Sequence, residues 1–465
     1  MSVHRLHQGV SPKGIIHSGL CVGCGSCVAR SGDNTAKMAF DQFGQLKPTG
    51  SDSFMDSRSI AVAATCPFSP SAETEDEIAA RIFPKAHKSH SSTGRYLEAY
   101  VGHVSDDAVR LAGSSGGMAT WVLAELMERG LIDGVAHVAA ADPDTAGTLF
   151  KYRISRTLEE VREAAKSRYY PIEMSEIVNE IRKIPGTYAF VGIPCFIKAI
   201  NNLRRDDPVL TERIRYTLGL FCGHMKSSWF VNSFAWQMGV EPDQVRAIDF
   251  RYKDPSRPAN WYCTELQLKG GGQVRQDWWN LVDGDWGAGY FMNSACNFCD
   301  DVVGETADIS FGDAWVEPYS SDGKGTNAVI VRTQELQQVL SDGIMSGDLK
   351  LSVVNGDFIE QTQAAGLRQR REGLAYRLSW HKGLMPRKRV APNSADIPPR
   401  RKLIYRIRFE ISRWSHSVFW CAQKLHTPGL YKAWARAAAV LYHGLAYSRG
   451  RMGAIVERLG FLGSS

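Results

Sequence analysis

Residues 97–140 read LEAYVGHVSDDAVRLAGSSGGMATWVLAELMERGLIDGVAHVAA and give the clearest indication of the fold class. The apolar segment 97–104 predicts a strand, and the glycine-rich loop Gly113–Gly117 follows it. Apolar residues at helical spacing predict a helix over 118–129, and the apolar segment 134–140 predicts a second strand. The order strand, glycine-rich loop, helix, strand is typical of a βαβ-like unit and predicts an α/β domain.

The same alternation continues along the chain. A helix is expected over 196–203, and further strands are expected at 188–192, 216–221 and 307–311. We therefore predict an α/β (α+β) fold, with one domain spanning residues 96–345. In such sheets the functional groups gather beyond the carboxyl ends of the strands.

The flanking regions differ in composition. Residues 15–70 form a small unit rich in glycine and cysteine, and residues 71–95 are polar and predict a linker. Residues 346–465 form an extension, which from about residue 400 is helical, basic and aromatic in pattern. The chain carries a net charge of +6, but residues 381–465 hold 16 Lys and Arg against 3 Asp and Glu, so the tail is +13 and the body −7.

The bulk composition is that of an ordinary globular protein of 465 residues, with 44% hydrophobic and 22% charged residues. The sequence contains no run of eighteen or more apolar residues, so no membrane span is predicted. Met1–Val10 lacks the apolar core of a secretory signal. We expect a cytoplasmic protein, where thiols stay reduced and cysteines serve metals more often than disulfides.

Four cysteines in the N-terminal unit have the spacing of iron–sulfur ligands. Cys21, Cys24 and Cys27 form a C-x2-C-x2-C run, and Cys66 followed by Pro67 completes the bacterial ferredoxin pattern. A zinc site is the alternative, because four thiolates also suit zinc. The pattern predicts a ferredoxin-like unit with one 4Fe–4S cluster.

A second set of four cysteines is spread more widely. Cys195 and Cys222 each follow a predicted strand, and Cys296 and Cys299 could reach the same sheet edge from a loop. Spacing alone leaves a second cluster, a zinc site, a redox dithiol and chance burial open.

The loop Gly113–Gly117 precedes a helix and could offer N–H groups to a phosphate, although it matches neither the GxGxxG fingerprint nor a P-loop. A plain turn is the alternative. No catalytic acid or base is indicated: His103, His137 and His224 lie near predicted motifs, and structural roles are the ordinary interpretation for each.

Together these segments resemble the family of coenzyme F420 hydrogenase/dehydrogenase beta subunits, whose relatives include ferredoxin-dependent 7-hydroxymethyl chlorophyll a reductases and divinyl chlorophyllide reductases. The matching segments follow the family order over roughly residues 15–335. They are Cys21–Cys27, Cys66-Pro67, Gly113–Gly117, Ser167-Arg168-Tyr169, Phe190–Cys195, Gly219–Cys222, Cys296-x-x-Cys299 and Ala307–Asp313. Arg168 stands where lysine is common in the family, and the basic tail lies outside the family core.

The resemblance implies two 4Fe–4S clusters and FAD as cofactors. It implies that the second cluster is held by Cys195, Cys222, Cys296 and Cys299 in the FAD domain. It further implies that the flavin nucleotide lies against two segments, formed by Ser114, Ser115, Gly116, Gly117, Ser167, Arg168 and Tyr169.

The expected function is that of a flavin- and iron–sulfur-dependent oxidoreductase. Electrons would pass between ferredoxin or coenzyme F420 and an organic acceptor, in a setting such as envelope polysaccharide biosynthesis. A flavin is needed because clusters carry one electron and most organic reductions need two. The alternatives are an electron-transfer subunit that docks on a partner enzyme, and a redox-silent zinc protein.

The basic aromatic tail predicts a contact of its own. Arg and Lys interleaved with aromatic residues on helices suit a membrane surface or a partner protein. Packing on the acidic body is the alternative, and no nucleic-acid motif is present. The interleaved residues are Arg401, Lys402, Ile404, Tyr405, Arg406, Ile407, Arg408, Phe409, Arg413, Trp414, Phe419 and Trp420.

Overall fold

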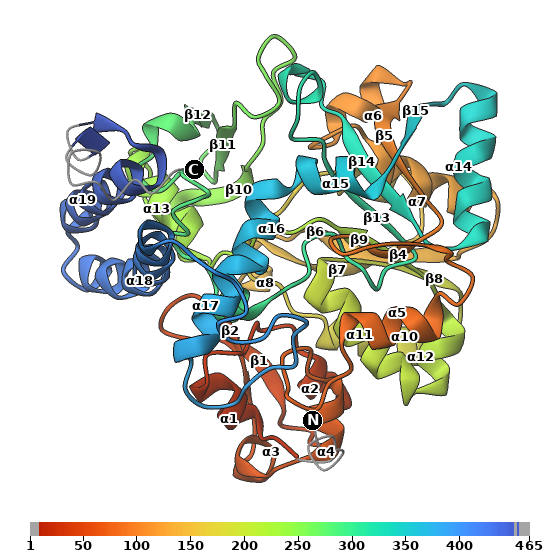
Figure 1. Ribbon diagram of the computed structural model, residues 1–465, viewed down its shortest axis with the longest axis horizontal. Coiled ribbons are helices and arrows are strands. Elements are labelled where there is room, and N and C mark those ends of the chain that lie inside the picture. The colour runs from red at the N-terminus through yellow and green to blue at the C-terminus, as the bar shows by residue number, and fades with distance from the viewer. Residues whose placement is uncertain (1–8, 451–452, 455–465) are drawn as a thin grey trace.

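The computed structural model describes residues 9–450 and 453–454, and its centre is an eight-stranded mixed sheet (Figure 1). In spatial order the strands are β15 (Leu349–Val354), β5 (Glu98–Val104), β14 (Asn327–Val331), β13 (Ile309–Asp313), β9 (Ile214–Leu220), β8 (Tyr188–Gly192), β6 (Gly134–Ala140) and β7 (Phe150–Ser155). Strands β13, β9, β8 and β6 are parallel in the middle, and antiparallel pairs flank them on both sides. The fold is α/β, as the sequence predicts.

The helix and the two strands predicted within residues 97–140 are confirmed, but these two strands are not neighbours in the sheet. Helix α7 (Met118–Glu128) follows β5 and precedes β6, as expected. Between β5 and β6, however, lie the later strands β14, β13, β9 and β8. Helical and strand periodicity are local properties, whereas strand order depends on pairing between residues far apart in the chain.

Both faces of the sheet are covered by helices. In β8, Tyr188 and Phe190 enter one core, while Ala189 and Val191 enter the core on the opposite face. The face of Tyr188 is covered by α10 (Ser175–Lys183), α11 (Pro194–Arg205) and α12 (Pro208–Arg213). The opposite face is covered by α7 and α14 (Gln334–Ser346).

The N-terminal unit lies against α10 and α11 at one end of the molecule (Figure 1). Its elements are α1 (Pro12–His17), α2 (Ser26–Arg30), β1 (Lys37–Phe40), β2 (Leu46–Thr49), α3 (Asp52–Asp56) and α4 (Ile60–Thr65). The backbone N–H of Met174 donates to the carbonyl oxygen of Cys24 at 2.9 Å. This bond attaches the first cysteine loop to the start of α10.

Residues 71–95, expected to be a linker, hold α5 (Glu75–Ile82) and a hairpin of β3 (Lys88–His90) and β4 (Gly94–Tyr96). A capping box formed by Thr74 and Glu77 starts α5. Within α5, Ile78 and Ala79 are buried. The apolar face of α5 is too short to mark a polar segment as a helix in the sequence.

A second, three-stranded antiparallel sheet is inserted along the chain between β9 and β13 of the central sheet. It consists of β10 (Val245–Asp249), β11 (Cys263–Leu268) and β12 (Gln273–Asp277), and α13 (Trp229–Gln237) precedes it. Shorter helices connect the strands of the main sheet: α6 (Asp107–Ala112), α8 (Pro143–Ala146) and α9 (Leu158–Glu163).

The C-terminal region is helical, as the pattern from about residue 400 predicts. After β15 come α15 (Gly356–Thr362), α16 (Ala364–Arg370), α17 (Glu372–Trp380), α18 (Pro399–Lys424) and α19 (Pro428–Tyr447). One face of the α18–α19 pair packs on the body, because Phe419 and Tyr431 are buried against Phe291. Among the described helices, none has the length and apolar character that a membrane crossing needs.

Candidate metal centres and cofactor site

The four cysteines of the first set surround one cavity. Cys21, Cys24 and Cys27 come from the loop that enters α2, and Cys66 follows α4. All four line an empty volume of about 390 Å³ that is partly open to solvent, with Ile15, Val62 and Phe68 among the apolar residues around it. Four thiols around an apolar cavity are the arrangement that a cubane cluster requires.

Two glycines allow the first loop to close around this cavity. Gly23 and Gly25 adopt left-handed φ angles of 82° and 81°. A Cβ atom at Gly23 would lie 2.4 Å from the carbonyl oxygen of Leu46, and one at Gly25 would lie 2.6 Å from a carboxylate oxygen of Glu173. Side chains at either residue would therefore clash and strain the backbone.

Burial favours the protonated thiol at Cys24, Cys27 and Cys66 when no metal replaces the proton. Burial raises the pKa of Cys24 to about 11, and it raises the pKa of Cys27 well above its ordinary value. All four cysteines line the same cavity, so negative charges on their sulfurs would repel one another. A bound metal would stabilise the thiolates in place of these protons.

The structure also brings the second set together. Cys195 lies in the first turn of α11, Cys222 follows β9, and Cys296 and Cys299 lie on a 3-10 turn, η4 (Ser294–Phe298), and just after it. Burial raises the pKa of Cys195 well above its ordinary value, and the charges of Cys299, Cys222 and Cys296 raise it further. The backbone N–H of Met225 donates to the sulfur of Cys296 at 3.3 Å.

The two sets are neighbours. Cys24 of the first set is among the charged groups that raise the pKa of Cys195. In addition, the side-chain amide of Asn293, just before η4, donates to the carbonyl oxygen of Val22 at 3.3 Å. The loops that carry Cys24 and Cys195, 171 residues apart in sequence, thus belong to neighbouring sites.

No group of three or more His, Cys, Asp or Glu side chains converges on a single metal-ion position in the described ranges 9–450 and 453–454. The chemistry of both donor sets nevertheless fits an iron–sulfur cluster, because each consists of four thiols and is buried or half-buried. The other two cysteines, Cys263 in β11 and the exposed Cys421 in α18, belong to neither set.

The two segments expected at the flavin nucleotide meet in the structure. The backbone N–H of Ser167 donates to the hydroxyl oxygen of Ser114 at 2.9 Å, and the hydroxyl of Ser115 donates to the carbonyl oxygen of Thr326 at 2.9 Å. Gly116 has no room for a side chain, since a Cβ atom there would lie 2.9 Å from the carbonyl oxygen of Gly102. Gly117 caps α7 with a left-handed φ of 83°.

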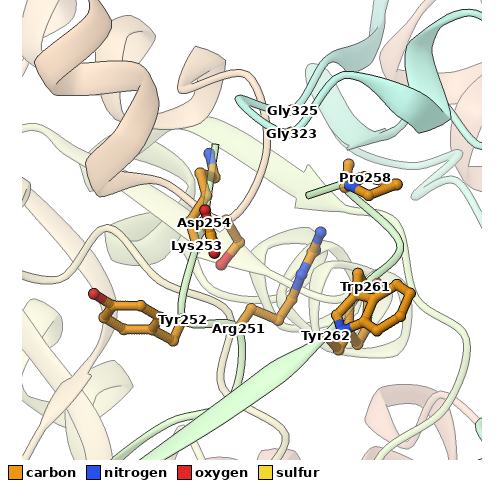
Figure 2. A pocket seen from close by; sticks show the side chains of 11 residues that line it. Arg251, Tyr252, Lys253, Asp254, Pro258, Trp261, Tyr262, Gly323 and Gly325 are labelled. Carbon is orange, nitrogen blue, oxygen red and sulfur yellow. The ribbon is translucent and has the colours of Figure 1, made fainter. Parts of the chain in front are cut away.

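Beside Ser114 lies a cavity of about 320 Å³, lined also by Arg251, Lys253, Trp261 and Tyr262 (Figure 2). Lys253 donates from Nζ to the carbonyl oxygens of Arg110, Ser115 and Lys324 at 2.7, 2.7 and 2.8 Å. Its ammonium group therefore ties the glycine-rich loop to the opposite wall of the cavity.

The charge around this cavity favours an anion. Burial, together with the positive charges of Arg251 and Lys166, lowers the pKa of Lys253 to about 7. Arg251 pairs with Asp313 at 2.9 Å, and its guanidinium group lies 4.5 Å from the centre of the Tyr262 ring. The cavity lining carries two cations, Arg251 and Lys253, and one carboxylate, Asp254, and this excess of cations beside a glycine-rich loop fits the pyrophosphate of a flavin nucleotide.

Arg168 and Tyr169 do not line this cavity, and both pack against aromatic side chains. The guanidinium group of Arg168 lies 5.0 Å from the ring centre of Phe150, and burial lowers the pKa of Arg168 to about 10. Its Nε has no hydrogen-bond partner among the described residues. The Tyr169 ring lies 4.7 Å from Trp286, which stacks on His224 at 4.1 Å. Trp286 thus connects the flavin segment with the chain that follows Cys222.

The three candidate histidines have structural surroundings. His103 hydrogen-bonds with the carbonyl oxygen of Val104 at 2.9 Å, and His137 hydrogen-bonds with the hydroxyl of Ser155 at 2.8 Å. Burial lowers the pKa of His137 to about 4 and that of His224 well below its ordinary value. None of the three lines either of the two cavities.

Sequence reasoning missed Arg251, Lys253 and Trp286 near the two segments expected to bind the flavin nucleotide, and it missed Arg370 at the second cysteine set. The sequence around Lys253, FRYKDPSRP, is basic and follows a strand, so a cation at a sheet end was a usable signal. Arg370 and Trp286 carry no local signal, because only distant chain segments bring them to the sites.

Two family models match the chain. The model of the coenzyme F420 hydrogenase/dehydrogenase beta subunit N-terminus matches residues 99–179, and that of the C terminus matches residues 186–356. Together they cover more than half of the chain. The chain belongs to this family.

Curated relatives come from Methanocaldococcus jannaschii. Uncharacterized protein MJ1349 is 28% identical over 227 residues, which is 47% of this chain and 56% of that protein. Coenzyme F420-dependent sulfite reductase is 22% identical over 339 residues, or 70% of this chain and 46% of that protein. The chain spans about half the length of these relatives.

Among solved structures, a chain of the F420-reducing NiFe hydrogenase complex from Methanosarcina barkeri is similar, with a TM-score of 0.49 and 17% identity. The match covers 64% of this chain and 99% of that chain. The curated relative with a named activity is thus a coenzyme F420-dependent reductase.

Proposed function

We propose that the chain is an iron–sulfur flavoprotein oxidoreductase that passes electrons between a carrier, coenzyme F420 or ferredoxin, and an organic acceptor. The observation that carries the proposal is the juxtaposition of two four-cysteine sets, whose loops are joined by the hydrogen bond from Asn293 to the carbonyl oxygen of Val22. In this proposal residues 15–70 hold the first 4Fe–4S cluster, and residues 96–345 hold the second cluster and FAD. Residues 346–465 are the extension.

The chemistry requires both kinds of group, because clusters carry single electrons whereas FAD, when bound, exchanges one electron or two. The residues of this chain supply binding and orientation. Eight cysteines hold the clusters, and Arg251 and Lys253 neutralise the pyrophosphate beside Ser114. Tyr169 packs on Trp286, and Trp286 stacks on His224, which lies two residues after Cys222.

The experiment is anaerobic electron exchange by the full-length chain, with its iron and flavin content measured beforehand. Reduced coenzyme F420 and oxidised ferredoxin are the probes, and reoxidation of the deazaflavin chromophore is followed. Exchange by the chain alone supports the proposal. A chain loaded with both cofactors that exchanges electrons with neither carrier would be the partner-dependent subunit instead, and a chain free of iron and flavin would overturn both alternatives.

The tail adds a proposed location at the cytoplasmic side of the inner membrane. The outer faces of α18 and α19 expose Leu403, Trp414, Trp420, Leu425, Leu430, Val440 and Leu441. The guanidinium group of Arg413 lies 5.3 Å from the Trp414 ring, and Lys424 lies 5.9 Å from the Trp420 ring. Glu410 is the single acidic residue in the two helices. Rings and cations on one helix pair match an anionic lipid surface.

Co-sedimentation with vesicles tests this location. We expect the chain to sediment with anionic vesicles, less so at high salt, and the double substitution Trp414→Ser and Trp420→Ser to weaken sedimentation at least about tenfold, since each exposed ring buries apolar area in lipid. Truncation before α18 is a poor test, because it would expose Phe291. Trp279→Ser, at an exposed Trp beyond β12, is the matched control. Equal sedimentation of the double variant and the wild type would assign the tail to packing alone.

A further inference from the structure

Arg370 is a buried cation placed between the two halves of the second cysteine set. It is the last residue of α16 and is 4% exposed. From Nη1 it donates to the carbonyl oxygen of Cys296 at 2.6 Å, and from Nη2 it donates to the carbonyl oxygen of Gly223, next to Cys222. Both bonds end on the backbone of ligand loops rather than on a counter-ion.

Arg370 has no carboxylate partner within the part of the chain that the structure describes. Its neighbour in the fold, Lys388, is also buried but pairs with Asp300 at 2.8 Å. An unpaired buried cation is costly, so an anion is expected beside it.

Among the described residues, the first cysteine set has no equivalent unpaired cation. Lys388 lies 5.2 Å from the ring of Phe68 at the first cavity, but it is paired with Asp300. Lys47 donates to the carbonyl oxygen of Cys21 at 2.8 Å, but it is only half-buried, so solvent screens its charge.

We propose that Arg370 is the internal counter-ion of the second cluster and sets its reduction potential above that of the first. The inference rests on the proposed function, in which both sets hold 4Fe–4S clusters. Reduction adds one negative charge to a cluster, and a buried cation stabilises that charge strongly in a medium of low dielectric constant. Electrons that enter at the partly solvent-open first cluster would then move inward to the second.

The test is a potentiometric titration of the anaerobically purified full chain, followed by electron paramagnetic resonance. Arg370→Gln removes the charge and keeps hydrogen-bond donors, while Arg370→Lys keeps the charge. We expect Arg370→Gln to shift electron occupancy from the second cluster to the first by at least tenfold, about 59 mV for a one-electron couple. Arg370→Lys should retain most of the wild-type separation.

Arg377 provides a matched control. It is buried on α17 and donates from Nε to the carbonyl oxygen of Asn297 at 2.7 Å, but no cysteine is among the groups that act on its pKa. Arg377→Gln should leave both potentials unchanged. Unchanged potentials in Arg370→Gln, or loss of the second cluster in both Arg370 variants, would show that Arg370 only supports the loops and would overturn the proposal. A wild-type chain with iron for one cluster would instead contradict the proposed function.

Discussion

Replacing Cys195 with alanine should lower the iron and acid-labile sulfide of the anaerobically purified chain from about eight atoms of each to about four. The thiol of Cys195 lies close to Cys222, Cys296 and Cys299, so its loss removes one ligand of the second set only. Cys66→Ala should remove the other four iron atoms, because Cys66 lines the first cavity.

Cys263→Ala is the matched control for both substitutions. Cys263 is half-buried in β11 and belongs to neither set, so its replacement should leave the iron content at the wild-type value. A wild-type content near four iron atoms that Cys195→Ala does not change would remove the second cluster from the proposal. A content near one zinc ion per set, without sulfide, would favour the zinc alternative.

The substitution Lys253→Ala is expected to weaken FAD binding about ten- to a hundred-fold. Lys253 already donates its three N–H groups to carbonyl oxygens, so it acts through its charge and by holding the glycine-rich loop in place, and each 1.4 kcal/mol lost is about tenfold in affinity. Calorimetric titration of the apo chain with FAD measures the loss. Lys324→Ala is the control, because the carbonyl oxygen of Lys324 accepts from Lys253 but its side chain pairs with Asp107 at 2.6 Å. Thermal unfolding of the apo variant shows whether the fold itself has been lost, and wild-type affinity in a folded Lys253→Ala chain would contradict the site.

The pH dependence of binding follows from the same lysine. Burial lowers the pKa of Lys253 to about 7, with Arg251, Lys166 and Arg110 lowering it further and Asp313 raising it, against an ordinary value of 10.5. Affinity for the pyrophosphate should fall as pH rises through about 7, because only the ammonium form attracts the anion.

Stability of the apo chain should change in the opposite direction. Between about pH 7 and pH 10.5 the unfolded chain keeps a proton that folded Lys253 has released, so the free energy of unfolding rises with pH from this group. Melting of the apo wild type and of Lys253→Ala across this window checks it. Identical pH profiles for the two chains would contradict the lowered pKa.

Much of the fold was predictable because its signals are local. The expected helix over 118–129 is α7, and the strand at 188–192 is β8 with the same bounds. Residues 71–95 contain a helix and a hairpin where a linker was expected, because only one short apolar face marks α5 in the sequence. Strand order was beyond the sequence, because β14 and β15 insert next to β5 through pairing with distant residues.

The sequence by itself determined the first cysteine set, since Cys21, Cys24 and Cys27 lie on one loop whose turns need Gly23 and Gly25. The resemblance placed the second set, but only the tertiary structure brings its four members together and adds the buried charge of Arg370. The same holds for Lys253, which joins three chain segments around the cavity. The physical reason is that periodicity and ligand spacing act over a few residues, whereas cavities and buried counter-ions arise from contacts between segments that the chain keeps far apart.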